Sequence, residues 1–482
     1  MHALSLVFIH TILVLFVHAT VFTPKCSLPE GNEKPTYVSS PQARSTLTIV
    51  WSSLGTIILC TWTILHLSIP EPQETGRHGA IWNAVRRRWL MFWRKFKWVL
   101  IALIMPEFLV GKSLGDLVSA CLSSGDPKMK EHARKSGIKW TLTHAYFANM
   151  GGYVLHEGDD QFSRNPPRHC HCCPNHFDIR DEKASVAGRW NELRAWGPGG
   201  LDESLDFNLP FTVNARQLCD LLDRGLITDL PRLSQEDIED KSKGDMLIKL
   251  WTLFQVLWLI VELIVRKVSG LSSSQLEITA LSFSVCSSIT YLLLLPKPKD
   301  IMIPEKIFTH RPLNEEDKEK IMQSQQLRFF GNALFSMMEP DPPKRTIPND
   351  MYNALPALWS IDLPSFKWGL SFEDCGFMLG AIVFGAVHVL AWNFEFPSSV
   401  EQTLWRITSV STAVIIPVYY LIELLILMIG VPKWVMQACS ITTYVLYTIA
   451  RLFIIVEVFR SLGYLPSDAF MATWPASIPH FG

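Results

Sequence analysis

The sequence carries little charge and no long charged tail. Only 18% of its 482 residues are Asp, Glu, Lys or Arg, and the formal net charge is −1 at pH 7. A net charge close to zero and the lack of a basic tail do not indicate nucleic acid, so no nucleic-acid partner is predicted. Hydrophobic residues make up 48% of the chain and tryptophan occurs 17 times, more than an average soluble domain contains. We therefore expect apolar segments that lie in a membrane.

The sequence also lacks the short motifs of common soluble enzymes. The glycine pair in NMGGYVLHEGDD (149–160) does not have the spacing of a dinucleotide- or phosphate-binding loop. The metalloprotease motif H-E-x-x-H is absent. We interpret the HEGDD that ends this stretch as a turn between secondary-structure elements and not as a catalytic carboxylate pair. The sequence therefore predicts no soluble-type active site and no organic cofactor.

The amino-terminal stretch MHALSLVFIHTILVLFVHAT has the features of a signal peptide. An apolar run from Leu4 to Val17 ends with Val17 and Ala19 at the positions that signal peptidase prefers. We expect cleavage after residue 19, with 20–45 as a short segment on the outer face. An uncleaved anchor is the alternative, because no Lys or Arg precedes the apolar run.

Six further windows are long enough to cross a hydrocarbon layer as helices. Lipid offers backbone N–H and C=O groups no partner outside the segment, so a helix is the only stable conformation there. The predicted fold class is an all-α membrane protein with about six transmembrane helices after the signal peptide. The predicted spans are 46–67, 247–265 and 278–295 (the last two a hairpin over 247–295), then 375–394, 407–430 and 434–456 within 375–456.

Residues 80–122 are predicted to contact the membrane without a full crossing. VLIALIMPEFLVG (99–111) is apolar but short, and Pro106 and Glu107 interrupt it, which indicates a re-entrant or interfacial segment. WNAVRRRWLMFWRKFKW (82–98) mixes basic and aromatic side chains, as does a helix that lies on a membrane surface and binds anionic lipid. Its basic residues are Arg86, Arg87, Arg88, Arg94, Lys95 and Lys97, among Trp82, Trp89, Trp93, Phe96 and Trp98.

This basic cluster predicts the orientation by the positive-inside rule. The cytosolic portions are then 123–246 and 296–372, whereas the loop EFPSSVEQ (395–402), which has no Lys or Arg, and the tail 457–482 lie outside. We expect an integral membrane protein of the secretory pathway, in the endoplasmic reticulum or the plasma membrane.

The cytosolic portions show few signs of a packed core. Ser234 and Asp237 have the spacing of a helix capping box, and the helix they start is predicted to run into the membrane span that begins at residue 247. EPDPPKRTIPND (339–350) has the composition of a loop. We find no internal repeat, and the halves of the membrane domain are not inverted copies, which disfavours a transporter.

The densest group of potential metal ligands is RHCHCCPNHF (168–177). A structural zinc site takes ligand pairs spaced C-x2–4-C and a second pair elsewhere. Cys170, Cys173 and His176 have a usable spacing if His144 or His156 supplies the fourth ligand. Three interpretations stay open: a variable loop with adventitious metal affinity, which we favour, a structural zinc site, or a catalytic centre.

Three ionisable side chains lie away from the ends of the predicted spans: His388, Glu423 and Arg451. A charged group at the bilayer centre costs about 2.5–3.5 kcal/mol even on the mildest scale, so each needs a partner or a water-lined cavity. Glu423 follows Tyr419 and Tyr420 by one turn. It is either a structural hydrogen-bond partner, or an anchor for a polar head or a proton donor to an alkene or epoxide in an apolar cavity. His388 and Arg451 are the candidates for the rest of such a catalytic site.

Two further carboxylates are explained by pairing along their own helices. Glu262 precedes Arg266 by one turn near the end of a span, and Glu457 precedes Arg460 in a similar way. We expect ion pairs in which the basic side chain reaches toward the membrane surface.

Four stretches together resemble one protein family. They are THAYFANMGGYVL (143–155), DIEDKSKGD (237–245), FGAVHVLAWNFEFPSSVEQTLWR (384–406) and ARLFIIVEVFRSLGYLPSDAF (450–470). They resemble the large group of polytopic membrane proteins that filamentous fungi, mushrooms especially, carry in many copies, and the resemblance runs from about residue 46 to the end. It implies an architecture and a host but no established activity, so no catalytic residue is carried over. For function it implies a role on a lipophilic metabolite of fungal secondary metabolism.

Three hypotheses of function follow from these features. The working hypothesis is a membrane-embedded enzyme, or an accessory protein of one, that acts on a lipophilic, isoprenoid-like small molecule with Glu423 as the acid. A transporter or sensor of a small hydrophobic molecule is the first alternative. The second is a membrane scaffold that gathers partners through its cytosolic portions.

Overall fold

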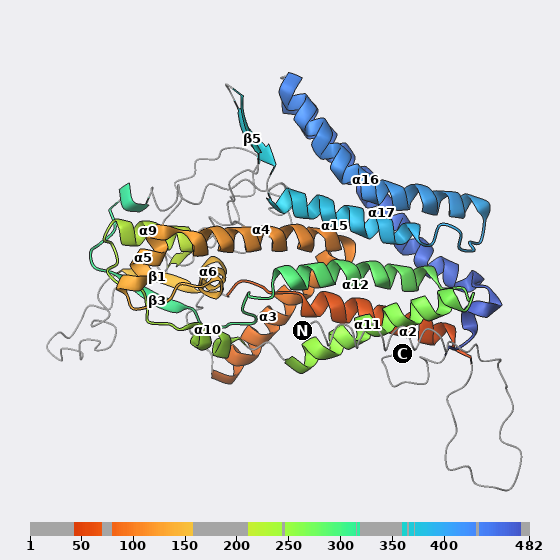
Figure 1. The fold of residues 1–482 in the computed structure, drawn as a ribbon, viewed down its shortest axis with the longest axis horizontal. Helices are drawn as coiled ribbons and strands as arrows, with labels where there is room; N and C mark the ends of the chain where they lie inside the picture. Colours follow the sequence, from red (N-terminus) through yellow and green to blue (C-terminus); the bar gives the residue numbers. More distant parts are fainter. Residues whose placement is uncertain are drawn as a thin grey trace, which may run out of the picture.

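The computed structural model describes residues 43–69, 80–157, 211–242, 246–314, 316–318, 359–363, 366–370, 372–429 and 433–473. This part of the chain is mostly helical (Figure 1), as the sequence predicts. Five of its helices are long and apolar enough to cross a membrane, and a bent helix pair makes a sixth candidate. The metal-ligand candidates Cys170, Cys173 and His176 and the predicted signal peptide lie outside the described residues.

Six helices lie at the six predicted windows, and all of them except α11 are among the five single-helix candidates for membrane spans. They are α2 (Thr46–Thr63), α11 (Met246–Val268), α12 (Gln275–Leu293), α15 (Phe372–Val389), α16 (Ser399–Ile429) and α17 (Lys433–Arg460). Side-chain oxygens fix two of their starts, because Ser45 accepts a hydrogen bond from the Thr48 N–H and Ser274 forms a capping box with Glu277. In Figure 1, α2, α11, α12 and α15 run side by side, and α16 bends, with Pro417 inside it.

The bent pair is formed by α3 (Ala80–Ile104) and α4 (Pro106–Gly125), which meet at an angle of 114°. Met105 separates them, and Pro106 starts the second helix. Proline has no N–H to donate back into α3 but fits the first turn of a new helix, so the sequence Met-Pro produces the break.

Glycines let α4 and α15 approach closely. Gly111 and Gly115 on α4, and Gly376 and Gly380 on α15, lie at the contact of the two helices, each pair four residues apart. A Cβ on Gly111 would lie 2.7 Å from a carbonyl oxygen of α15, and one on Gly380 would lie 2.8 Å from the Cα of Glu107. This small-residue spacing on both helices is typical of tight helix contacts in membranes.

A small α/β unit lies at one end of the helices (Figure 1), and the sequence did not predict it. Its three-stranded sheet has the order β2-β1-β3, with β1 antiparallel to β2 and parallel to β3. Its core is buried, and each fully buried large apolar side chain contributes about 1.5–3 kcal/mol. The unit comprises α5 (Pro127–Lys135), α6 (Leu142–Asn149), β1 (Tyr153–Glu157), β2 (Phe211–Val213), α9 (Ala215–Asp223), α10 (Gln235–Lys241) and β3 (Glu305–Thr309), around Tyr146, Phe147, Leu155, Leu218 and Leu226.

The prediction that one helix runs from Ser234 into the membrane span is wrong about the length of that helix. Its start is as predicted, because Ser234 and Asp237 form a capping box. The helix ends at Lys241, however, and Ser242 has an extended backbone, so α10 and α11 are separate helices. Ser242 instead exchanges hydrogen bonds with Lys299, which holds α10 against the chain that follows α12.

Buried lysines attach the α/β unit to the long helices. Lys297 lies 2.6 Å from Asp116 of α4, and Lys299 donates to the carbonyl of Thr63 at the end of α2, also at 2.6 Å. A lysine at this carbonyl satisfies a group that the last turn of α2 leaves without an intrahelical partner. The remaining strands, β4 (Trp359–Leu363) and β5 (Phe366–Leu370), form a separate antiparallel hairpin.

Candidate functional site

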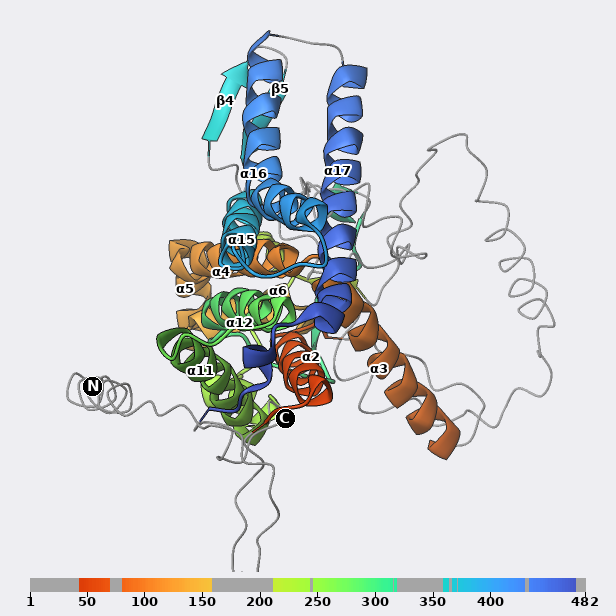
Figure 2. The ribbon, with the colours of Figure 1, turned by 90° about the vertical axis from the view of Figure 1, so that its right-hand side faces the viewer.

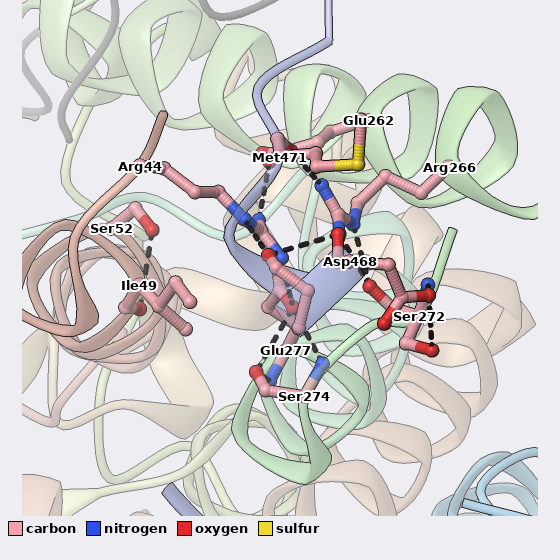
Figure 3. A network of polar contacts seen from close by, with 11 residues as sticks. Arg44, Ile49, Ser52, Glu262, Arg266, Ser272, Ser274, Glu277, Asp468 and Met471 are labelled. Atoms are coloured by element: carbon pink, nitrogen blue, oxygen red, sulfur yellow. Dashed lines mark hydrogen bonds and ion pairs between the residues drawn. The ribbon is translucent and has the colours of Figure 1, made fainter. Parts of the chain in front are cut away.

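A network of charged side chains ties the start of α2 to α11, α12 and the chain after α17 (Figure 3). The Arg44 guanidinium donates to Glu277 at 2.5 Å and to Glu262 at 2.8 Å. Arg44 Nε donates to the Ala469 carbonyl at 2.7 Å. Burial alone would lower the pKa of Arg44, but the carboxylates of Glu277 and Glu262 outweigh it and raise that pKa. Arg44 is therefore a fixed cation in this network.

Arg266 is fully buried in the same network. Its guanidinium donates to the backbone carbonyls of Ser272, Asp468, Ala469 and Met471, the last at 2.8 Å. The predicted arrangement, in which Arg266 reaches the membrane surface, is therefore wrong. The carboxyl-terminal segment folds back over α11 and supplies carbonyls to Arg266, while Glu262 forms its ion pair with Arg44. The second predicted pair also differs, because Arg460 pairs with Glu401 at 2.5 Å.

A second polar group lies where α3 breaks into α4. Glu107 is fully buried; its Oε1 accepts a hydrogen bond from the Tyr447 hydroxyl of α17. Its Oε2 has no hydrogen-bond partner among the described residues, and the Arg451 guanidinium lies 3.9 Å from it. Arg451 also donates to the Ile104 carbonyl at 2.8 Å and 3.0 Å. The break at Met105 leaves that carbonyl without a helical partner, so the arginine of a distant helix takes its place.

His388 lies beside this group and is held by packing. Its Nδ1 lies 2.8 Å from the Phe384 carbonyl, which can only accept, so Nδ1 carries a proton. Its Nε2 lies 3.2 Å from the Thr279 hydroxyl. Both candidate residues contact the Phe384 ring, with the Arg451 guanidinium 3.7 Å from its centre and the centre of the His388 ring 4.4 Å from it. The geometry fits a buried structural histidine.

A third polar group contains Glu423. Tyr419, one turn earlier on α16, donates a hydrogen bond to the Glu423 carboxyl group. Tyr420 donates to Asp374 Oδ1, at the start of α15, at 2.6 Å. The charges of Asp374 and Glu423 interact with each other and with the Tyr444 phenol of α17. Three helices thus bring two carboxyl groups and three phenols together.

The structure brings the three predicted catalytic residues only partly together. Arg451 and His388 share the Phe384 ring, whereas Glu423 belongs to the group around Asp374. His144, considered as a zinc ligand, has its Nε2 3.0 Å from the Leu233 carbonyl. Within the described ranges no group of three or more His, Cys, Asp or Glu side chains could hold a metal ion.

Two carboxyl groups of these sites, those of Glu107 and Asp374, were not predicted from the sequence. Glu107 stood in a stretch interpreted as interfacial, and Asp374 stands one residue before a predicted span. Their positions in the sequence could have indicated them, because each carboxylate lies in or directly beside an apolar run. An ionisable group there is costly and needs a partner.

A family model described as a family of unknown function (DUF8562) matches residues 9–169 and 212–323, more than half of the chain. The chain belongs to this family. No curated protein and no solved structure matches it. Membership in a family of unknown function agrees with the expectation of a family that has no established activity.

The residues matched by the DUF8562 family model include some of the polar groups and leave out others. The match contains Arg44, Glu107, Glu262 and Glu277, but α15, α16 and α17 lie beyond its end. The predicted resemblance runs to the end of the chain, further than the match. The Glu423 group lies wholly outside the matched residues, so family membership adds nothing about its role.

Proposed function

We propose that the protein is a multi-pass membrane protein of the fungal secretory pathway that acts on a lipophilic, isoprenoid-like metabolite of secondary metabolism. In this proposal it is a membrane-embedded enzyme or the required accessory protein of one. Its α/β unit faces the cytosol, in agreement with the basic residues of the loops around it.

The observation that carries the proposal is that Asp374 and Glu423 lie near enough for their charges to interact. Such an interaction in apolar surroundings favours one ionised and one protonated carboxyl group, which makes one a base and the other an acid. Tyr420 fixes Asp374, and Tyr419 fixes Glu423. In the proposed reaction Glu423 protonates an alkene carbon or an epoxide oxygen of the substrate, and the π bond or the ring C–O bond breaks to give a carbocation. The Asp374 carboxylate then removes a proton from a carbon next to the cationic carbon, which forms the alkene of the product.

The surface around Glu423 suits a substrate that arrives from the bilayer. Leu421, Ile422 and Leu425, its neighbours on α16, are exposed, with Leu421 at 56%. Glu423 itself is partly buried. A carboxyl group at the edge of an apolar helix surface is accessible to a molecule dissolved in lipid, whereas a water-soluble substrate would have to leave water to reach it.

The test is untargeted metabolite and lipid profiling of a fungal host that expresses the wild type or Glu423→Gln, with protein abundance checked by blot. We expect a lipophilic species that appears with the wild type and is lost with Glu423→Gln and with Asp374→Asn. Glu236→Gln, which changes an exposed carboxylate of α10, is the matched control and should retain the product. Equal profiles for Glu423→Gln and the wild type would contradict the assigned role of Glu423.

The break between α3 and α4 favours transport as a second candidate function. Interrupted helices with buried charges, here Glu107 and Arg451, are typical of substrate and ion sites in transporters. Proteoliposomes that move a small hydrophobic molecule across the bilayer, and lose that flux in Glu107→Gln but not in Glu423→Gln, would support this candidate over the enzyme.

A further inference from the structure

Helix α3 differs from the other long helices in its charge. Its 25 residues, Ala80–Ile104, contain no acidic residue and six basic ones. The basic residues are Arg86, Arg87, Arg88, Arg94, Lys95 and Lys97. Such a helix carries a net charge of six on one element of a chain whose total is −1, so it attracts anionic groups specifically to this place.

Large apolar side chains form an exposed stripe on the same helix. Trp82, Val85, Trp89 and Phe92 follow each other at spacings of three and four residues, which places them on one face. All four are exposed, Trp82 at 61% and Trp89 at 63%. The rings of Trp89 and Phe92 lie 6.0 Å apart. Exposed tryptophans in such a row are costly in water and favourable at the headgroup level of a membrane.

The position of α3 fits the surface of a membrane. Its carboxyl-terminal part is buried in the bundle through Trp98, Val99 and Ala102. Lys95 lies 4.8 Å from the ring centre of Trp62, near the end of α2, and 3.5 Å from Asp300, which follows α12. Lys95 therefore lies near the ends of two long helices, α2 and α12. Figure 2 shows the rest of α3 leaving the bundle obliquely from there.

We propose that the part of α3 before Lys95 lies on a membrane surface and binds anionic phospholipid. The apolar stripe enters the boundary of the acyl chains, and the basic side chains reach the phosphate and carboxylate groups of the lipid. The inference uses the membrane location proposed above but not the chemistry at Glu423.

The test measures hydrogen exchange of the amides of residues 80–94 in the full-length protein. The protein is reconstituted in nanodiscs of phosphatidylcholine alone, or with one third phosphatidylserine. We expect exchange to be slowed about tenfold or more by the anionic lipid, because each basic side chain near the surface strengthens binding roughly fivefold. Arg87→Glu combined with Arg88→Glu should remove most of this difference. Lys130→Glu combined with Lys139→Glu makes the same charge change at exposed sites of the α/β unit and should leave the difference intact.

Equal exchange of α3 in the two lipid compositions would overturn the proposal. So would an anionic-lipid effect that survives in Arg87→Glu/Arg88→Glu, or one that disappears equally in the control pair. Failure of the wild type to enter nanodiscs at all would overturn the membrane location, and with it both proposals. A normal lipid response in Glu423→Gln that has lost its product would keep the two proposals separate.

Discussion

The polar groups around Arg44 and around Glu423 stabilise their carboxyl groups in different ways. In the first, arginines neutralise the carboxylates and backbone carbonyls accept the remaining guanidinium hydrogens. In the second, tyrosine hydroxyls donate to two neighbouring carboxyl groups. The first group joins four segments of the chain, whereas the second is formed by α15, α16 and α17.

This difference fits a structural role for the group around Arg44 and the proposed chemical role for the group around Glu423. A buried ion pair with all its hydrogen bonds made is rigid and has no proton to give, and losing one partner leaves an uncompensated charge. A carboxyl group held by a phenol keeps its hydrogen bond whether or not it is ionised, so it can exchange a proton without loss of the local structure. The following predictions test this contrast through stability and activity.

The largest effect is expected for Arg44→Met. It leaves the carboxylates of Glu277 and Glu262 buried without their guanidinium, which should lower the free energy of unfolding by about 3–5 kcal/mol. Thermal unfolding of the purified protein in detergent measures the change. Arg134→Met is the matched control, because its pair with Glu131 is exposed to solvent and its loss should change the stability little.

A double substitution sharpens this result. In Arg44→Met combined with Glu277→Gln, the amide still accepts hydrogen bonds from Ser274 but needs no counter-ion, so part of the stability should return. If the double variant were less stable than Arg44→Met alone, the buried charge would not be the cause of the loss.

The long helices were predictable from the sequence because helices that could cross a membrane are long and apolar, but the partners of their charged side chains were not. Glu262 and Arg266 lie one turn apart, yet Glu262 pairs with Arg44, 218 residues away. Glu107 and Tyr447 are separated by 340 residues. Sequence spacing predicts contacts along one helix, whereas these contacts depend on how helices are arranged around each other.

The α/β unit was missed for a different reason. β1 is only five residues long, and its Val154 and Leu155 are both buried, so the alternation typical of a half-exposed strand is absent. Its parallel partner, β3, follows about 150 residues later, beyond two long helices. Such a strand looks like any short apolar run until its partner is known.

The second-largest effect on stability is expected for Gly385→Ala. This substitution lies at the contact of α15 with α16, the helices that carry Asp374 and Glu423. In Gly385→Ala the added Cβ would lie 2.5 Å from the backbone nitrogen of Ala413, so the helices must move apart. We expect a loss of about 1–3 kcal/mol in stability and reduced product formation. Gly55→Ala is the matched control, because nothing lies within 4 Å of its Cβ and alanine favours the helix. Equal losses for both variants would contradict the close contact.

A smaller effect on stability is expected for Glu423→Gln and Asp374→Asn. The amide oxygens can still accept from Tyr419 and Tyr420, so stability should change by less than about 1 kcal/mol. Product formation should nevertheless be lost, because an amide donates no proton. If either variant lost as much thermal stability as Arg44→Met, both carboxyl groups would have a structural role like that of the Arg44 network, and the proposed contrast would be wrong.

The smallest effect is a local response to acid at the edge of the Arg44 network. Although burial raises it, hydrogen bonds from the Ser272 hydroxyl and N–H hold the pKa of Asp468 below its ordinary value. A carboxyl group with a lowered pKa stabilises the fold above its unfolded pKa of about 3.9, and this contribution is lost as the pH falls through the folded value. Amide exchange in residues 461–473, corrected for its intrinsic pH dependence, should therefore increase below about pH 4.

Two substitutions decide whether Asp468 causes this response. Asp468→Asn should make exchange in the segment faster at neutral pH and remove its acid dependence. Asp229→Asn neutralises an exposed carboxylate of the α/β unit and should leave the acid response intact. An acid response that persists in Asp468→Asn would assign it to another carboxylate of the network, with Glu277 the first to test because it carries the shortest contact to Arg44.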